Sequence, residues 1–234
     1  MSAIDYITEA RKQGRAALDE LAGKRLLASF GVSVPKSLVV QDATEAATAC
    51  GNLKPPLVLK VVSPDILHKS DAGGVKVGLG NAHEVEEAVR AMMKRPAIES
   101  ARIDGFLLEE MAPAGQEVVI GGLRDPQFGP LVMVGLGGVF VEVLADVSFR
   151  ICPITRLDAE EMLDELKGAP LLKGVRGRPP VSRAAIIDVL LKVGGEDGLL
   201  MQHAADIQEA DINPLIVSGE GAVAVDARFV LTKR

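Results

Sequence analysis

The sequence has no tryptophan, one tyrosine and six phenylalanines among its 234 residues. Proteins that hold single-stranded nucleic acid use exposed aromatic side chains beside a basic groove, and this composition argues against that class. The formal net charge of -6 at pH 7 argues the same way, because an excess of carboxylates repels a polyanion. We therefore expect no nucleic-acid partner, and any phosphate ligand must be held by a local cluster of donors.

Cysteines and long apolar runs are scarce as well. Cys50 and Cys152 are far apart, and no CxxC pair or neighbouring histidine indicates a zinc site. The longest apolar run, residues 130–141, is shorter than the ~20 residues that span a bilayer. The first residues have neither the basic nor the apolar region of a secretory signal. These observations predict a cytoplasmic protein with no membrane partner.

Apolar residues make up 48% of the chain and charged residues 25%, as in an ordinary globular domain. The hydrophobic periodicity predicts an α+β (α/β) fold of two lobes with a ligand cleft between them. The expected helices are 5–29, 42–49, 81–94, 158–167 and 182–193, and the expected strands are 37–40, 57–62, 75–79, 105–111, 117–123, 131–136 and 139–144, followed by a hairpin over 212–230. We expect the later strands to form an antiparallel sheet.

Glycine-rich segments raise the question of a phosphate-binding loop. The sequence contains no GxxxxGK[ST] pattern, which excludes a P-loop. Residues 135–138 (GLGG) follow an expected strand, as in a dinucleotide-binding turn, but they lead into residues 139–143, which have the composition of a strand. We therefore interpret this segment as a connection between strands.

Lys60 lies within an apolar strand, where an unpaired ammonium group would be costly to bury. Either an anion faces it, or its amino group reaches water at the edge of the sheet. The loop that follows carries His68, Lys69 and Ser70 next to glycines, and such a loop can cover phosphates with backbone N–H groups and lysines. His68 is either a phosphoryl acceptor, since imidazole can take up such a group, or a solvated loop residue.

The C-terminal hairpin permits a geometric prediction. If Gly219 and Glu220 form its two-residue turn, Asn213 lies opposite Asp226, with Cβ atoms ~5 Å apart. These two oxygen-bearing side chains could share a hard cation such as Mg²⁺, which keeps several waters and nucleotide phosphate oxygens. The alternative is a local turn at Asn213-Pro214 and a solvated Asp226.

The other chemically interesting side chains have plain alternatives. The carboxylates of Glu109, Glu110 and Glu117 belong either to a site or to the solvated surface. His83 and His203 lie in helical contexts, and we interpret both as structural residues.

Residues 59–75, LKVVSPDILHKSDAGGV, closely resemble the nucleotide-binding part of ADP-forming acyl-CoA synthetases. Further segments match the same family: 124–130 (RDPQFGP), 135–142 (GLGGVFVE), 176–180 (RGRPP) and 211–215 (DINPL). The resemblance covers nearly the whole chain and implies the ATP-grasp fold, in which two lobes clamp ATP, as in the β subunit of succinyl-CoA synthetase. It implies an N-terminal helical arm that packs on the large lobe (1–34), a small lobe (35–108) and a large lobe (109–234).

The resemblance also implies roles for individual residues. His68 matches a histidine that accepts phosphate transiently, and Asn213 and Asp226 match magnesium ligands. The residues expected to bind ATP are Lys60, Lys69, Ser70, Glu109, Met111 and Glu117. The opening helix departs from the family, because Gly23 stands where alanine is usual and weakens that helix.

The overall reaction of the family is acyl-CoA + ADP + phosphate ⇌ carboxylic acid + ATP + CoA. By resemblance, this chain is the phosphoryl-transfer subunit of an acid–CoA ligase, with ATP/ADP and Mg²⁺ as cofactors. It would need a CoA-binding α subunit or a fused equivalent, to which acyl-CoA and the acid bind. Two alternatives stay open: a non-catalytic nucleotide-sensing module that regulates an acyltransferase, and a carboxylate–amine ligase.

Overall fold

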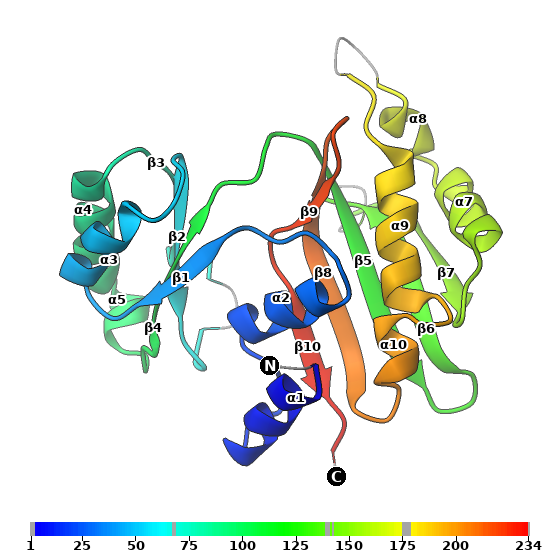
Figure 1. Ribbon diagram of the computed structural model, residues 1–234, viewed down its shortest axis with the longest axis horizontal. Helices are drawn as coiled ribbons and strands as arrows, with labels where there is room; N and C mark the ends of the chain where they lie inside the picture. The colour runs from blue at the N-terminus through cyan, green and yellow to red at the C-terminus, as the bar shows by residue number, and fades with distance from the viewer. Residues whose placement is uncertain (1–2, 67–68, 139–140, 142, 175–178, 234) are drawn as a thin grey trace. The chain divides into compact units, whose positions relative to one another are not determined.

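In the computed structural model, the chain forms two compact units. Figure 1 shows the course of the chain by colour, from the N-terminus to the C-terminus. The residues that the structure describes are 3–66, 69–138, 141, 143–174 and 179–233. Unit 1 comprises residues 1–34 and 113–234, and unit 2 comprises residues 35–112. The boundary expected between residues 108 and 109 falls inside a strand, whereas unit 2 extends to Ala112.

Unit 2 is a four-stranded antiparallel sheet in the order β1-β4-β2-β3, with an apolar core between its helices and one face of the sheet (Figure 1). Its elements are β1 (Ser37–Val40), α3 (Ala43–Cys50), β2 (Leu57–Val62), β3 (Val75–Leu79), α4 (Ala82–Met93), α5 (Pro96–Glu99) and β4 (Gly105–Glu110). The side chains of Asp42 and Asn81 accept hydrogen bonds from the backbone N–H groups of Glu45 and Glu84. These caps confirm the predicted starts of α3 and α4.

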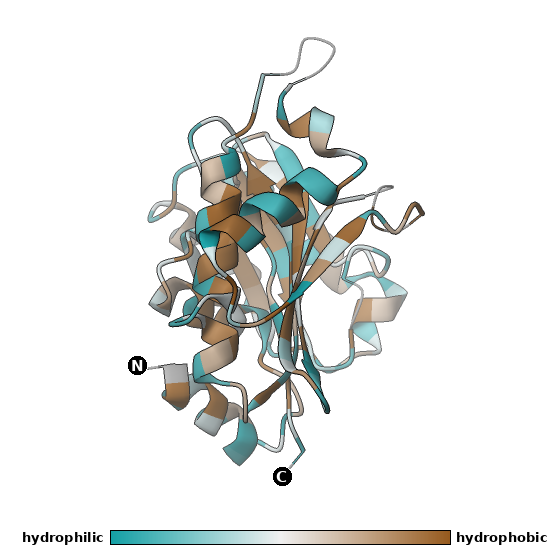
Figure 2. Cartoon of the chain, turned by 90° about the vertical axis from the view of Figure 1, so that its right-hand side faces the viewer, coloured by the Kyte–Doolittle hydropathy of each residue, from teal (hydrophilic) through white to brown (hydrophobic). Residues whose placement is uncertain are grey.

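Unit 1 is built on a six-stranded antiparallel sheet in the order β10-β8-β5-β6-β7, with β9 paired to β8. Its strands are β5 (Gln116–Asp125), β6 (Gly129–Leu136), β7 (Val147–Ile151), β8 (Ile207–Val217), β9 (Ala222–Ala224) and β10 (Arg228–Leu231). Its helices are α1 (Ala3–Lys12), α2 (Glu20–Ser29), α7 (Arg156–Glu165), α8 (Ala169–Leu172), α9 (Arg183–Gly194) and α10 (Leu199–Gln202). Figure 2 shows apolar residues on both the strands and the helices, and the aliphatic core of unit 1 is formed by residues of both, including those of α7 and α9.

Residues 16–18 of the N-terminal segment form backbone hydrogen bonds with β10. The N–H of Leu18 donates to the carbonyl of Phe229 at 2.9 Å, and the N–H of Leu231 donates to the carbonyl of Ala16 at 2.8 Å. These backbone bonds extend the pairing of β10 beyond β8, and they explain why residues 1–34 belong to unit 1.

Two predictions about elements are wrong. The single helix expected over residues 5–29 is two helices, because Gly14 adopts a φ of 68° and Asp19 caps a new start at α2. The strand expected over residues 139–144 is a turn at residues 143–144, while residues 139, 140 and 142 lie outside the described part. Val141 folds back over β6, since its Cγ2 lies 2.8 Å from the place that a Cβ on Gly135 would occupy.

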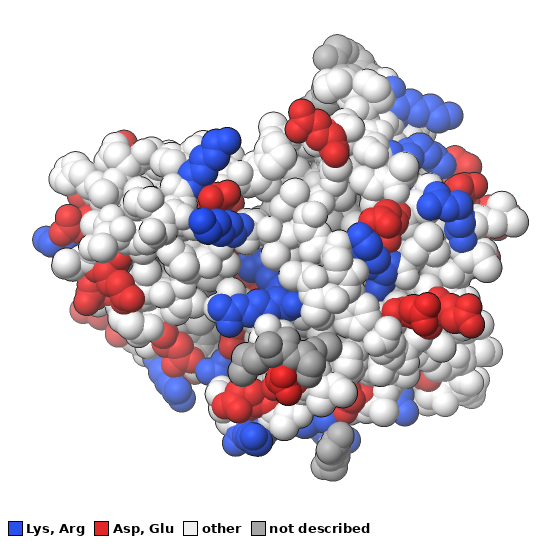
Figure 3. All heavy atoms as spheres, viewed as in Figure 1, with Lys and Arg blue, Asp and Glu red and all other residues white. Residues whose placement is uncertain are grey.

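Charge is mixed over the face displayed in Figure 3, where Lys and Arg spheres alternate with Asp and Glu spheres. A surface of this kind does not concentrate a polyanion. Among the described residues, none of the helices has the length and apolar character needed to cross a membrane.

His203 is a buried histidine that follows α10. Its ring centroid lies 5.9 Å from that of Phe30 in an edge-to-face arrangement, and its Nε2 has no hydrogen-bond partner among the described residues. Burial lowers the pKa of His203 below its ordinary 6.5, partly offset by the nearby Asp206. The residue is structural, as expected.

We expect the free energy of unfolding to fall as the pH drops from about 7 to about 5, because the unfolded chain protonates this imidazole before the folded chain does. Above this range both states are neutral and the contribution is constant. Each unit by which the pKa is lowered corresponds to about 1.4 kcal/mol. Urea titrations at several pH values should show a weaker pH dependence in His203→Leu, whereas exposed His83→Leu should follow the wild type. An unchanged slope in His203→Leu would contradict this account.

Candidate functional site

Lys60 and Glu109 form a buried ion pair on the sheet of unit 2. The pairing of β2 with β4 places Lys60 opposite Leu107 and Val58 opposite Glu109, so the two charged residues are diagonal neighbours on one face. Lys60 Nζ lies 2.7 Å from Glu109 Oε1, and the side chains are 7% and 1% exposed. The anion expected to face Lys60 is therefore a carboxylate of the same chain. The alternatives of a lysine that reaches water and a solvated Glu109 are both wrong.

The loop between β2 and β3 is anchored directly beside Lys60. The N–H of Val61 donates to the carbonyl of Gly74 at 2.8 Å, and the N–H of Gly74 donates to the carbonyl of Lys69 at 2.7 Å. Gly74 packs so closely on Val61 that a Cβ could not be accommodated. This anchoring holds Lys69 half-buried and Ser70 exposed in a turn, and His68 lies outside the described residues.

Met111 and Glu117 lie near the ends of strands. Met111 follows β4 and is exposed, and its N–H donates to the carbonyl of Pro56 at 2.9 Å, so a nucleotide contact through that N–H would replace this bond. Glu117 in β5 is exposed, and its carbonyl accepts the N–H of Gly137 at 2.8 Å. A Cβ on Gly137 would lie 2.7 Å from the Cβ of Glu117, which explains the glycine at that point of the turn.

In unit 1, the hairpin register leaves Asp226 at the position opposite Asn213. The N–H of Ser218 donates to the carbonyl of Gly221 at 2.9 Å and closes the predicted turn at residues 219–220. The strand pairs that flank Asn213 and Asp226 have the register that this turn sets. On one side Leu215 lies opposite Ala224, and on the other side Asp211 lies opposite Arg228. Asn213 lies inside β8, so the alternative of a local turn at Asn213-Pro214 is wrong.

A β-bulge lies next to Asn213. The pairing of β8 with β5 shifts by one residue between the pairs Val118–Leu215 and Ile120–Ile212. The residues of β8 that face the core change from even to odd numbers across it: Ala210 and Ile212 before, Leu215 and Val217 after. Bulges re-aim side chains next to functional sites, and here Asn213 is directed away from the core.

Asp211 is a candidate that sequence reasoning missed. It precedes Asn213 by two residues, and alternate residues of a strand share a face. Burial and the negative charge of Asp226 raise the pKa of Asp211, with Arg228 acting in the opposite direction. The signal was available in the motif DINPL, whose first and third residues are both oxygen donors on one face of β8.

The donor set fits a magnesium ion. The Asn213 amide and Asp226 carboxylate are hard oxygen donors of the kind that Mg²⁺ prefers, and the register of the hairpin holds them at opposed positions. Within the described residues, no group of three or more His, Cys, Asp or Glu side chains could hold a metal. A cation that retains waters and phosphate oxygens suits such a sparse set of protein ligands.

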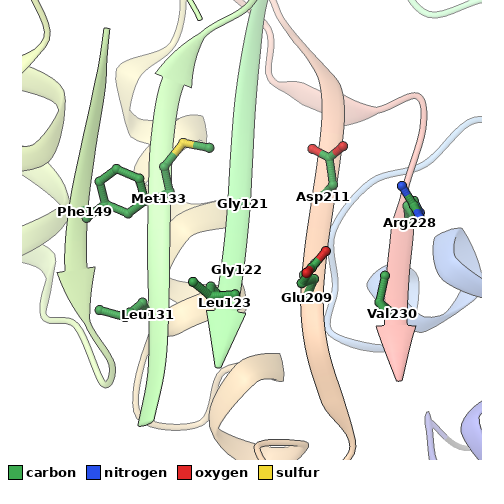
Figure 4. Close-up of a pocket in the computed structure, with 11 residues that line it drawn as sticks. Gly121, Gly122, Leu123, Leu131, Met133, Phe149, Glu209, Asp211, Arg228 and Val230 are labelled. Carbon is green, nitrogen blue, oxygen red and sulfur yellow. The ribbon is translucent and has the colours of Figure 1, made fainter. Parts of the chain in front are cut away.

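A hollow of about 330 Å³ opens on the face of the unit 1 sheet that carries Asp211 (Figure 4). Its lining follows two cross-strand rows: Arg228, Asp211, Gly121, Met133 and Phe149 in one, and Val230, Glu209, Leu123 and Leu131 in the other. Figure 4 shows apolar side chains on β5, β6 and β7 and carboxylates on β8. This face therefore combines an apolar strip with an acidic one.

Comparison with known proteins identifies the family. A family model described as an ATP-grasp domain matches residues 9–231. The β subunit of acetate–CoA ligase (ADP-forming) I from Pyrococcus furiosus is 45% identical over 98% of this chain and 97% of that protein. Acetate–CoA ligase (ADP-forming) I from Archaeoglobus fulgidus is 43% identical over 89% of this chain, but the match spans 30% of that longer protein.

Solved structures agree with this relationship. The acetyl-coenzyme A synthetase 1 of Ca. Korarchaeum cryptofilum, in complex with coenzyme A, Ca-AMPCP and HgCl⁺, matches with a TM-score of 0.92 and 43% identity over 99% of this chain and 100% of that chain. A structure of the same protein with coenzyme A and Mg-AMPPCP, its phosphohistidine segment pointing towards the nucleotide binding site, matches with a TM-score of 0.85 and 42% identity over the same shares. The chain belongs to the ATP-grasp family of the ADP-forming acid–CoA ligases.

Proposed function

We propose that this chain is the ATP- and ADP-binding phosphoryl-transfer subunit of an ADP-forming acid–CoA ligase. The observation that carries the proposal is the match to the P. furiosus β subunit, which is nearly complete in both directions. The net reaction is acyl-CoA + ADP + phosphate ⇌ carboxylic acid + ATP + CoA. Since these reactants are intracellular metabolites, we assign the protein to the cytoplasm.

The reaction requires a companion that binds CoA and the acid. The longer A. fulgidus relative, of which this chain matches 30%, supports a companion equivalent to the rest of such a protein. We therefore infer a hetero-oligomer in which the companion forms acyl phosphate and this chain exchanges the phosphoryl group with ADP.

In unit 2, Lys60 would donate to nucleotide phosphate oxygens, exchanging or sharing its bond with Glu109. A buried ammonium binds an anion more strongly than one in water, because the local dielectric is low. Lys69 and Ser70 lie on the loop that would cover the phosphates, and Glu109 and Met111 would meet the adenosine part. The imidazole of His68 would attack the γ-phosphorus of ATP as its bond to the ADP oxygen breaks, and the reverse step would return the group to ADP.

In unit 1, Asn213 and Asp226 would hold a divalent cation by their side-chain oxygens, and Glu117 would lie near the nucleotide. Mg²⁺, when bound, supplies charge neutralisation at the phosphate oxygens. The register of β8 against the strands that flank Asp226 supports this assignment, because it holds the two side chains at opposed positions.

Substitutions at Lys60 and Glu109 separate stability from nucleotide binding. We expect Lys60→Met or Glu109→Gln alone to lower the free energy of unfolding by about 3–5 kcal/mol, because each removes one partner of a buried ion pair. The double variant Lys60→Met/Glu109→Gln should regain most of that stability but bind ADP weakly, since the phosphate donor is gone. Urea unfolding and calorimetric ADP titration measure the two effects, and ADP affinity equal to wild type in the double variant would contradict the role of Lys60.

Substitution of the proposed metal ligands should weaken metal-dependent binding. We expect Asn213→Ala and Asp226→Ala to lower the affinity for MgADP at least about 10-fold, the effect usual even for groups that only support a ligand. Binding of ADP in the presence of EDTA should not change. Glu220→Ala, in the turn of the same hairpin, is the matched control, and calorimetry with unchanged metal dependence in both ligand variants would reject the assignment.

Phosphoryl transfer to His68 can be tested on the chain alone. With γ-labelled ATP and Mg²⁺, we expect label on the protein that is stable to base and labile to acid, as a phosphohistidine is. The label should be lost in His68→Ala and retained in His83→Ala, an exposed histidine on α4. Full labelling of His68→Ala would rule out this residue as the acceptor.

The same assay separates the other functions. A nucleotide-sensing module would bind ATP but exchange no label between ADP and ATP, even with the companion present. A carboxylate–amine ligase would turn over alone with an amine acceptor.

A further inference from the structure

Helix α2 carries a charged pair in the interior of unit 1. Lys24 is 1% exposed and Glu20 is 8% exposed. Lys24 Nζ lies 2.9 Å from Glu20 Oε1, one helical turn away. Lysine and glutamate are almost never fully buried unless they are paired, and here the ion pair is what allows both to lie in the interior.

Stability does not account for this pair. Two charges lose their hydration when they are buried, and their attraction often does no more than balance the loss. In other proteins, apolar side chains of similar volume often replace such a pair with no loss of stability. A role in holding a neighbouring group is the better account.

The neighbouring group is the segment that contains Asp226. Lys24 Nζ lies 3.5 Å from the carbonyl oxygen of Val225, the residue before Asp226. On the other side, Gly23 is so close to the residue after Asp226 that a Cβ would lie 2.6 Å from the carbonyl oxygen of Ala227. Helix α2 therefore contacts the backbone on both sides of Asp226.

This segment needs such support because residues 225–227 lie between β9 and β10 and outside both strands. The N–H of Val225 donates to the carbonyl of Pro214 at 3.0 Å, and Asp226 Oδ1 accepts the N–H of Ala227 at 2.8 Å. These bonds tie the segment to β8 and orient the carboxylate. The contacts with α2 restrain the segment from a second element.

We propose that the Glu20–Lys24 pair positions Asp226 for the divalent cation, with Glu20 orienting Lys24 and Lys24 holding the Val225 carbonyl. The inference rests on the proposed function, and it makes both residues positioning residues. Gly23, which weakens α2 by its own helix propensity, allows the helix to approach the Ala227 carbonyl this closely.

The double variant Glu20→Gln/Lys24→Met tests the inference, because it removes both charges of the pair and keeps the side-chain volume. With Mn²⁺ as the probe, electron paramagnetic resonance of free Mn²⁺ in the presence of ADP measures metal affinity directly. We expect the dissociation constant for Mn²⁺ to rise about 10-fold, as when groups that orient metal ligands are removed. Calorimetry with EDTA should give the wild-type affinity for ADP.

The control is Asp188→Asn/Lys192→Met. This pair has the same spacing on α9 but is less buried, with Asp188 exposed and Lys192 half-buried, and Lys192 also contacts the N-terminal segment through the carbonyl of Gly31. Since Lys192 bonds to Asp188 and to the carbonyl of Gly31, neither of which belongs to residues 225–227, loss of this pair should leave the Mn²⁺ affinity at the wild-type value.

Wild-type Mn²⁺ affinity in a folded Glu20→Gln/Lys24→Met variant would overturn the positioning role, as would an equal loss of metal-free ADP binding. Thermal unfolding checks that the variant is folded. If it is not, Lys24→Arg decides, because it keeps the charge but places a larger head group at the Val225 carbonyl; unchanged Mn²⁺ affinity there would also overturn the inference. If Asn213→Ala loses Mn²⁺ affinity while the pair variant keeps it, only the positioning role is rejected. If Asn213→Ala and Asp226→Ala both keep the wild-type affinity, the proposed metal site itself is rejected.

Discussion

The backbone pairing of β8 is the constraint on which the unit 1 site depends. This strand bonds to β5 on one side and to β9 and β10 on the other. Because neighbouring residues of a strand point to opposite faces, a slip by one residue would move Asn213 to the wrong face. The short turn at residues 219–220 sets the register on the hairpin side, and the bulge against β5 lets the apolar residues on both sides of Asn213 reach the core. The same strand thus presents oxygen donors on one face and apolar side chains to the core on the other.

The parts of the fold that local chemistry determines could be predicted from the sequence. Side-chain caps at Asp42 and Asn81 start α3 and α4 where expected, and a short apolar run predicts β2 within the bounds that the structure gives it. The opposition of Asn213 and Asp226 followed from a two-residue turn, since that turn alone fixes which residues face each other. In each case, the residues that determine the structure lie close together in the sequence.

The features that required the structure depend on contacts between distant segments. Glu109 is the partner of Lys60 because β2 pairs with β4, and the sequence of neither strand predicts that pairing. The bulge beside Asn213 appears only when β5 is aligned with β8. The helix break near Gly14 was missed because the residues around it have helical periodicity, and the turn at 143–144 was missed because valines there have strand composition. The burial of Glu20 and Lys24 also required the structure, because charged residues four apart on a helix usually form an exposed pair.

The division of the chain has a consequence for its order of synthesis. Unit 2 is one continuous stretch, 35–112, whereas unit 1 joins the two ends of the chain, with β10 bonded to residues 16–18. A nascent chain can therefore complete unit 2 soon after it emerges from the ribosome, while residues 16–18 wait for β10, which follows unit 2 and most of unit 1 in the sequence. Translation that stops before Arg228 would leave a lobe with its Lys60–Glu109 pair assembled and a second lobe unable to bind its own first residues.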